Sequence, residues 1–151
     1  MSGGMIRRCF AAVVLFTSLA ALGCGGNDLP TVPVRGRVTF AGGPPPAKGS
    51  ITFMPHSGSS PAGLPSKPGS AQFDTDGSFE VTSFKLGDGL LPGTYGVIIS
   101  CIKDYQNLSA NPDSIAVRDH VPEGFRPDDL VIKEGDEQIE LTYDVPAKKE
   151  S

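Results

Sequence analysis

Apolar and polar residues alternate with a period of two in several short stretches of the chain. In residues 34–40 (VRGRVTF) the apolar side chains fall on one face, and the arginines and the threonine fall on the other. Residues 50–54 and 138–144 repeat this pattern, which is typical of β-strands that bury one face. Residues 95–102 (YGVIISCI) are apolar on both faces, which predicts a central strand.

Turn-forming residues separate these stretches. Three consecutive prolines in residues 41–49 cannot donate ladder hydrogen bonds, and residues 56–70 are rich in Gly, Pro and Ser, which predicts a loop. Residues 74–77 (DTDG) predict a hairpin turn between residues 71–73 and 78–81. Six or seven short strands without helical periodicity indicate an all-β sandwich. Its expected core comprises Val38, Phe40, Ile51, Phe53, Phe79, Val81, Tyr95, Val97, Ile99, Ile139 and Leu141.

The N-terminal residues show a different pattern. Two arginines precede an uncharged, mostly apolar run from Cys9 to Leu22, and glycines surround Cys24. A basic start, an apolar stretch and a small residue at the cleavage point predict a secretory signal peptide over residues 1–23. A membrane-spanning helix is disfavoured, because it needs roughly 20 apolar residues and this run is shorter.

Residues 19–24 (LAALGC) resemble a bacterial lipobox, in which the cysteine thiol is lipidated and the cysteine becomes the new N-terminus. The alternative is an ordinary cleaved signal beside which Cys24 is incidental. The lipobox interpretation makes residues 24–33 a lipidated, palmitate-bearing tether and places the protein in the cell envelope, anchored to a membrane. Gly25 resembles the pattern that permits sorting to an outer membrane, so we expect that membrane, facing the periplasm or the exterior.

Composition narrows the possible partners. Residues 24–151 carry 11 basic and 17 acidic residues, a net charge of −6, which argues against nucleic acid as a partner. Cys101 is the one cysteine outside the signal and the lipidation position, so no internal disulfide is expected. It follows Val97 and Ile99 at strand spacing and is expected to be buried; a reactive thiol or an inter-chain bridge is the alternative.

Several motifs follow one another in an order that resembles a known family. They are the strand at 34–40, a Gly/Pro turn, Ile51-Thr52-Phe53-Met54-Pro55, residues 73–79 with their Asp-Gly turn, Leu91-Pro92-Gly93-Thr94-Tyr95-Gly96-Val97, and the segment 121–144. This order is similar to the transthyretin-like, or carboxypeptidase regulatory-like, domain of small lipoproteins of planctomycete-type bacteria. The resemblance implies an antiparallel, seven-stranded, Ig-like or prealbumin-like β-sandwich over residues 34–145, followed by a polar tail at 146–151. It also implies that the domain has no catalytic activity.

Candidate catalytic and metal-binding residues are few. His56 and His120 lie in predicted loops without a second histidine or a cysteine at ligand spacing, so solvent-exposed side chains are the simpler interpretation. No nucleophile-elbow motif accompanies the serines. Residues 74–77 could suggest calcium, but a strand follows them where a calcium loop needs further oxygen ligands. We therefore expect no enzyme activity, no metal and no cofactor.

Two classes of function remain. The first is an envelope structural or protein-interaction module, and the alternative is a small-ligand binder, for example of carbohydrate. The chain contains no Trp, an aromatic platform that sugar sites favour, so the interaction module is preferred. Residues 105–129 form a long stretch without a period, and loops on a rigid sandwich often carry recognition. Tyr105, His120 and Phe125 are the candidate contacts for an unidentified envelope protein, and an edge strand of the sandwich is the alternative contact.

Overall fold

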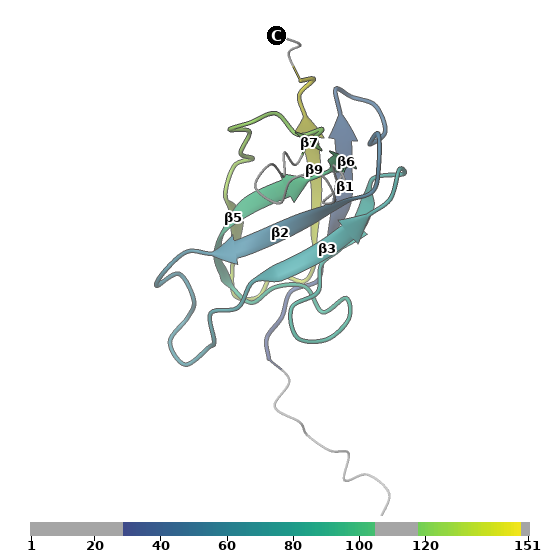
Figure 1. Ribbon diagram of the computed structural model, residues 1–151. Helices are drawn as coiled ribbons and strands as arrows, with labels where there is room; N and C mark the ends of the chain where they lie inside the picture. Colours follow the sequence, from purple (N-terminus) through teal and green to yellow (C-terminus); the bar gives the residue numbers. More distant parts are fainter. Residues whose placement is uncertain (1–28, 105–117, 149–151) are drawn as a thin grey trace, which may run out of the picture.

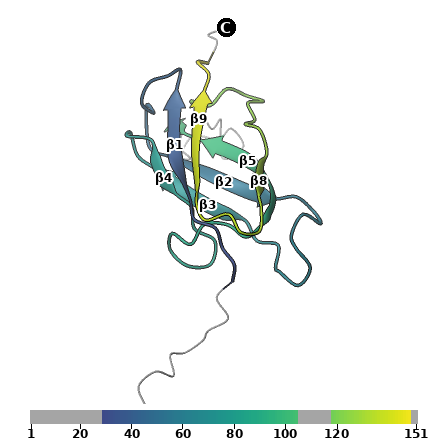
Figure 2. The same cartoon turned by 180° about the vertical axis from the view of Figure 1, so that it is seen from behind.

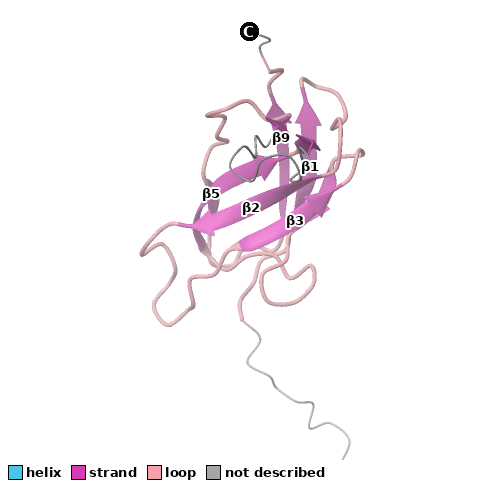
Figure 3. Ribbon diagram, in the orientation of Figure 1, coloured by secondary structure: helices cyan, strands magenta, loops and turns pink. Residues whose placement is uncertain are grey.

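The computed structural model describes residues 29–104 and 118–148, which form nine β-strands and no helix (Figure 1; Figure 3). The strands are β1 (Val34–Phe40), β2 (Gly49–Pro55), β3 (Gly69–Phe73), β4 (Ser78–Glu80), β5 (Gly93–Ser100), β6 (Ile102–Asp104), β7 (Arg118–Asp119), β8 (Leu130–Ile132) and β9 (Ile139–Val145). None of the described residues builds a helix of the length and apolarity needed to cross a membrane. The expected all-β class is confirmed.

Two larger sheets face each other and enclose the core. One holds three strands in the order β4-β1-β9, and the other holds four in the order β3-β2-β5-β8; β6 and β7 form a small separate ribbon. Figure 1 and Figure 2 show β1 and β9 side by side in one layer, while β2, β3 and β5 run obliquely across the other. The described residues therefore form a β-sandwich.

One strand pair differs from the expected antiparallel arrangement. β1 and β9 are parallel and in register along their whole length, from Val34 opposite Ile139 to Phe40 opposite Val145. The first two strands also belong to different sheets, whereas the immunoglobulin order places them in the same sheet. The alternation of apolar and polar residues identifies the buried face of a strand. It is the same whether the neighbouring strand is parallel or antiparallel, so it could not predict that β1 and β9 are parallel.

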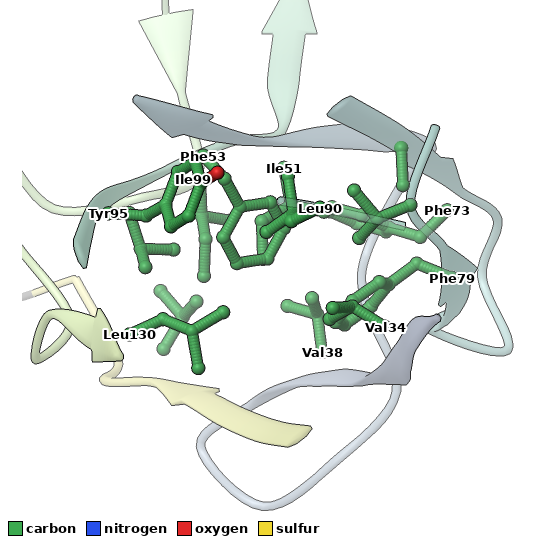
Figure 4. Packing of buried hydrophobic residues seen from close by; sticks show 14 of the residues in the cluster. Val34, Val38, Ile51, Phe53, Phe73, Phe79, Leu90, Tyr95, Ile99 and Leu130 are labelled. Atoms are coloured by element: carbon green, nitrogen blue, oxygen red, sulfur yellow. The ribbon is translucent and has the colours of Figure 1, made fainter. Parts of the chain in front are cut away.

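The turn at residues 74–77 forms as predicted, but it does not close a hairpin. The Gly77 N–H donates to the Asp74 carbonyl oxygen (2.9 Å), and Gly77 has a φ of +78°, a left-handed conformation that glycine adopts without strain. Nevertheless β3 pairs with β2, and β4 pairs with β1. The expected hairpin ladder does not form, because Phe73 and Phe79 enter the core from opposite sheets (Figure 4). The two arms of the turn meet only further along, at the antiparallel bridge between Ser70 and Thr82.

The core contains most of the expected residues. Those confirmed as buried are Val38, Ile51, Phe53, Phe79, Val81, Tyr95, Val97 and Ile99. Phe40, Ile139 and Leu141 are only partly buried, because Phe40 ends its strand and the other two lie on β9 at the edge of a sheet. Val145 is buried too and continues the alternation of β9 by one step beyond the predicted strand. Further buried side chains come from shorter segments: Phe73, Leu90, Leu91, Leu130 and Ile132.

The packed domain begins before the expected boundary at Val34. Val32, which the sequence analysis placed in the tether, is only 4% exposed and belongs to the core cluster. It exchanges two backbone hydrogen bonds with Leu90, one of 2.7 Å and one of 3.0 Å. Packing therefore extends into the segment that was predicted to be a tether.

Tyr95 ties the start of β5 to the segment before it. Its side chain is buried, and its phenolic O–H donates to the carbonyl oxygen of Leu91, four residues upstream, at 2.9 Å. Burial raises the pKa of Tyr95, so the phenol stays protonated and keeps donating at neutral pH. This arrangement is similar to the tyrosine corner of two-sheet sandwiches, in which a phenol fixes the entry to a strand.

Two core phenylalanine rings lie against glycines on neighbouring strands. Gly36 is the cross-strand partner of Phe79, and a Cβ added at Gly36 would be 2.7 Å from the Phe79 Cζ atom. Gly49 is the cross-strand partner of Phe73, and a Cβ there would overlap both the Phe73 ring and the carbonyl oxygen of Ser100. Because glycine has no side chain, Gly36 and Gly49 each leave room for the phenylalanine ring that packs against them.

Gly49→Ala is expected to lower the free energy of unfolding by about 1–3 kcal/mol, the usual cost of overpacking. The Ser100 carbonyl oxygen is a backbone atom and cannot rotate away from the added methyl group. Urea denaturation followed by circular dichroism measures the change. Gly43→Ala is the matched control, because its Cβ would meet only the Phe40 carbonyl oxygen at 3.5 Å, so a change within about 0.5 kcal/mol is expected. Equal stability of the two variants would contradict the packing argument.

Candidate functional site

The outer faces of the two large sheets differ in charge. The outward positions of β4-β1-β9 include Arg35, Arg37, Glu80, Glu140 and Asp144. On this face the guanidinium of Arg35 pairs with Glu80 at 2.9 Å. The outward positions of β3-β2-β5-β8 carry no charged side chain; they are Ser50, Thr52, Met54, Ser70, Gln72, Thr94, Gly96, Ile98, Ser100 and Val131. We call this second surface the uncharged face.

Three large apolar side chains are exposed on the uncharged face. Met54 is 43% exposed, Ile98 is 46% exposed and Val131 is 56% exposed. They come from three adjacent strands, because β5 lies between β2 and β8. Hydroxyl groups of serine and threonine separate them. A flat surface of this composition can contact another apolar surface without leaving an unpaired charge behind.

A histidine and an aspartate lie together at one end of the uncharged face. His56 directly follows β2 and Asp129 directly precedes β8, and the imidazole Nε2 is 3.5 Å from the carboxylate Oδ2. Both side chains are half exposed. A Cβ added at Gly96 would be 3.3 Å from the His56 Nε2, so the pair lies over the notch that Gly96 leaves. The sequence indicated His56 alone, because its partner Asp129 is 73 positions further along the chain.

The described residues around His56 and Asp129 do not form a catalytic Ser-His-Asp arrangement. The nearby Ser59 hydroxyl donates to two backbone carbonyl oxygens, that of His56 (2.8 Å) and that of Thr94 (3.1 Å), instead of to the imidazole. Within residues 29–104 and 118–148, no group of three or more His, Cys, Asp or Glu side chains is placed to hold a metal ion.

Two of the three predicted contact residues, His120 and Phe125, lie in the described part of the chain. Tyr105 lies outside the described residues. His120 is partly exposed, and its backbone N–H donates to the carbonyl oxygen of Cys101 (2.9 Å). Phe125 is partly buried and packs against the hydrophobic core instead of standing free on a loop. Tyr143 is likewise partly buried, and burial together with the nearby Asp128 carboxylate raises its pKa to about 12.

Asp119 joins the segment after β7 to the end of β5. Its carboxylate accepts hydrogen bonds from the Ser100 hydroxyl (2.7 Å), the Cys101 N–H (2.9 Å) and the Val121 N–H (2.9 Å). Beside this junction, at the Ser100 end of the uncharged face, lies a shallow hollow of about 560 Å³. It is lined by Ala47, Lys48, Gly49, Ser50, Gln72, Ser100 and Ile102. The polar groups that line the hollow are the hydroxyls of Ser50 and Ser100, the side-chain amide of Gln72 and the ammonium group of Lys48.

Cys101 is buried, as its spacing predicted. Its side chain has no exposed surface, and its thiol lies 3.4 Å from the carbonyl oxygen of Ala47, to which it donates. Burial raises the pKa of the Cys101 thiol, and the neighbouring Asp119 carboxylate raises it further. The thiol therefore stays protonated at neutral pH, which makes it a poor nucleophile.

Comparisons of this chain with protein-family models, with curated proteins and with solved structures find no match. The resemblance to the transthyretin-like domain therefore stays a prediction.

Asp119→Asn is expected to lower the free energy of unfolding by about 1–3 kcal/mol, because one acceptor oxygen then replaces two and an amide N–H₂ group faces other donors. Thermal or urea denaturation measures the loss. Glu123→Gln serves as the control, since Glu123 is exposed and makes no hydrogen bond or ion pair with the described residues, so it should shift stability by less than about 0.5 kcal/mol. Equal stability of Asp119→Asn and the control would show that the hydrogen bonds of Asp119 do not hold β7 to β5.

Proposed function

We propose that this chain is a lipid-anchored cell-envelope protein whose β-sandwich binds a partner protein through the uncharged face and catalyses no reaction of its own. The observation that carries this proposal is the contrast between the two outer faces. One sheet presents charged side chains, including the cross-strand pair Arg35–Glu80, and the other presents Met54, Ile98 and Val131 among hydroxyl groups. Interface centres are depleted in charge and enriched in residues such as methionine.

We also propose the seven-stranded prealbumin-like form of the sandwich. Three observations support it. The two large sheets together hold seven strands, Tyr95 makes a tyrosine-corner hydrogen bond to Leu91, and the motifs of residues 34–144 follow the order of the family that the sequence resembles.

The spacer between the proposed anchor and the domain is short. Because Val32 is already in the core, only the seven residues from Gly25 to Thr31 separate Cys24 from the packed domain, and they reach at most about 25 Å when fully extended. Figure 1 shows that the chain enters at one end of the sandwich and that the C-terminal residues leave at the other. The domain would therefore stand close to the membrane surface with its sheet faces directed sideways.

A protein partner fits the uncharged face better than a carbohydrate does. Sugar rings stack on exposed aromatic side chains, and no described outward position of β3-β2-β5-β8 is aromatic. Phe125 and Tyr143, two aromatics that could have supplied such a platform, are both partly buried against the core. The shallow hollow beside Lys48 is the feature that favours the small-ligand alternative.

Lipidation of Cys24 is tested by expressing the full chain in a bacterial host that processes lipoproteins. Intact-mass analysis is expected to show a chain that begins at Cys24 and carries acyl groups, and the protein should partition into the detergent phase. Cys24→Ser should abolish both the acyl mass and the partitioning, because a stable anchor needs at least two lipid chains. Cys101→Ser is the control and should keep the anchor. An unmodified N-terminus would exclude this part of the proposal.

The partner surface is tested by placing a photo-crosslinking amino acid at Ile98 and, as the matched control, at Arg37 on the charged face. Both positions are exposed on the outer side of a central strand. Illumination of intact cells is expected to give a discrete protein adduct from position 98 and none from position 37. Adducts of equal yield from both positions would contradict a specific face. An adduct of saccharide mass from position 98 would support the small-ligand alternative instead.

A further inference from the structure

The two large sheets have four edges, and three of them are short or partly covered. β4 and β8 contain three residues each. β3 is bridged on its outer side by Thr82, whose backbone exchanges hydrogen bonds of 2.9 and 3.0 Å with Ser70. β9 is the exception, because it is seven residues long and no described strand lies on its outer side.

The backbone groups on the outer side of β9 can be named from the ladder. The β1–β9 ladder runs from the Ile139 N–H, which donates to Pro33, to the Val145 carbonyl oxygen, which accepts from Ala41. In a parallel pair, alternate residues point their backbone groups at the neighbour. The N–H and C=O groups of Glu140, Thr142 and Asp144 therefore point away from β1, and no backbone hydrogen bond to them is found within residues 29–104 and 118–148.

β9 has only one of the features with which proteins protect an exposed edge. Natural edge strands carry charged side chains (lysine above all), proline or a bulge, or they are very short. The charged residues of β9 are the outward-facing Glu140 and Asp144, both acidic. The sequence of β9, IELTYDV, contains neither proline nor lysine, and its register with β1 is continuous. Its inward residues Ile139, Leu141 and Tyr143 stay partly exposed, whereas Val34 and Val38 on the adjacent β1 are fully buried. An additional strand would complete the cover of these side chains.

We propose that the open edge of β9 binds an extended segment of a partner protein by strand addition, and that this segment alternates apolar with basic residues. Its apolar side chains would cover Leu141 and Tyr143, and its basic side chains would face Glu140 and Asp144 on the outer side of the sheet. Opposite charges across neighbouring strands are favourable, and like charges are not. A second copy of β9, paired antiparallel about Thr142, would place Glu140 against Asp144, so self-pairing in that register is disfavoured by charge.

This inference rests on the proposed interaction function and gives it a second contact surface. The uncharged face and the β9 edge belong to different sheets. Their tests can therefore fail independently: crosslinking from position 98 reports on the face, and the experiments below report on the edge.

Hydrogen exchange of the full-length protein in detergent, followed residue by residue, tests whether the edge is open. The amides of Glu140, Thr142 and Asp144 are expected to exchange rapidly, and those of Leu141 and Tyr143 are expected to be protected. Protection of all five amides in the isolated protein would overturn the proposal, because the edge would already be covered. If that protection grew with protein concentration, the cover would be a second copy.

Binding is tested with a synthetic peptide, acetyl-Lys-Val-Lys-Val-Thr-Ile-Lys-amide. Its addition is expected to slow exchange at Glu140, Thr142 and Asp144, and a version with glutamate in place of lysine should bind at least about tenfold more weakly. Thr142→Pro removes an outward N–H without touching the β1 ladder and should weaken binding by about tenfold or more, whereas Thr142→Ala should bind as the parent does. Equal binding by all three proteins would overturn the proposal.

A second measurement keeps the test decisive if Thr142→Pro does not fold. Two N-methylated peptides are compared on the unmodified protein. Methyl groups on the amides that face β9 should abolish binding, and methyl groups on the alternate amides should leave it intact, because only the first set forms the new ladder. If both methylated peptides bound equally, the contact would not be strand addition and the proposal would fail.

Discussion

The close seating of two phenylalanine rings on two glycines is the constraint on which the rest of this sandwich depends. Phe79 lies against Gly36 within one sheet, and Phe73 lies against Gly49 within the other. The Phe79 ring also meets Phe53 of the opposite sheet, with ring centroids 6.4 Å apart (Figure 4). Because interiors are packed as densely as organic crystals, the sheets can close on these rings only where no Cβ intervenes. The glycines at positions 36 and 49 therefore let the two sheets approach around these rings.

Acidic side chains stabilise the loops that connect the strands of the two sheets. Asp88 accepts hydrogen bonds from the backbone N–H groups of Ser83, Phe84 and Lys85, and Asp119 gathers three donors between β5 and β7. Asp144 accepts from Gly42 and Thr39, bonds that lower the pKa of its carboxyl. These carboxylates therefore have a structural role in holding irregular connections. Because the pKa of Asp144 is lower in the folded protein, its bonds stabilise the fold at neutral pH, and this contribution is lost as the pH falls through the lowered pKa.

The alternation of the sequence was enough to predict the strands and most of their buried faces, because a side chain's face depends only on its own strand. It could not predict which strands become neighbours. Residues 139–145 alternate just as a central strand would, yet β9 lies at an edge. The Asp-Gly turn satisfied every local criterion of a hairpin, but the core separated its strands. His56 and Asp129 meet only because β2 and β8 both flank β5, which no local pattern encodes.

The two proposed contact surfaces follow from how the charge is distributed over one closed fold. The net charge of −6 over residues 24–151 disfavours adsorption of the domain to an anionic membrane surface. The charged outer face of β4-β1-β9 would lose favourable solvation if it were buried. Burial of the uncharged face removes apolar side chains from water without desolvating a charged group. The β9 edge borders the charged face, so a segment added there must bring the complementary basic residues. The two proposed contacts thus differ in kind. The contact on one sheet is apolar, and the contact at the edge of the other uses backbone hydrogen bonds and opposite charges.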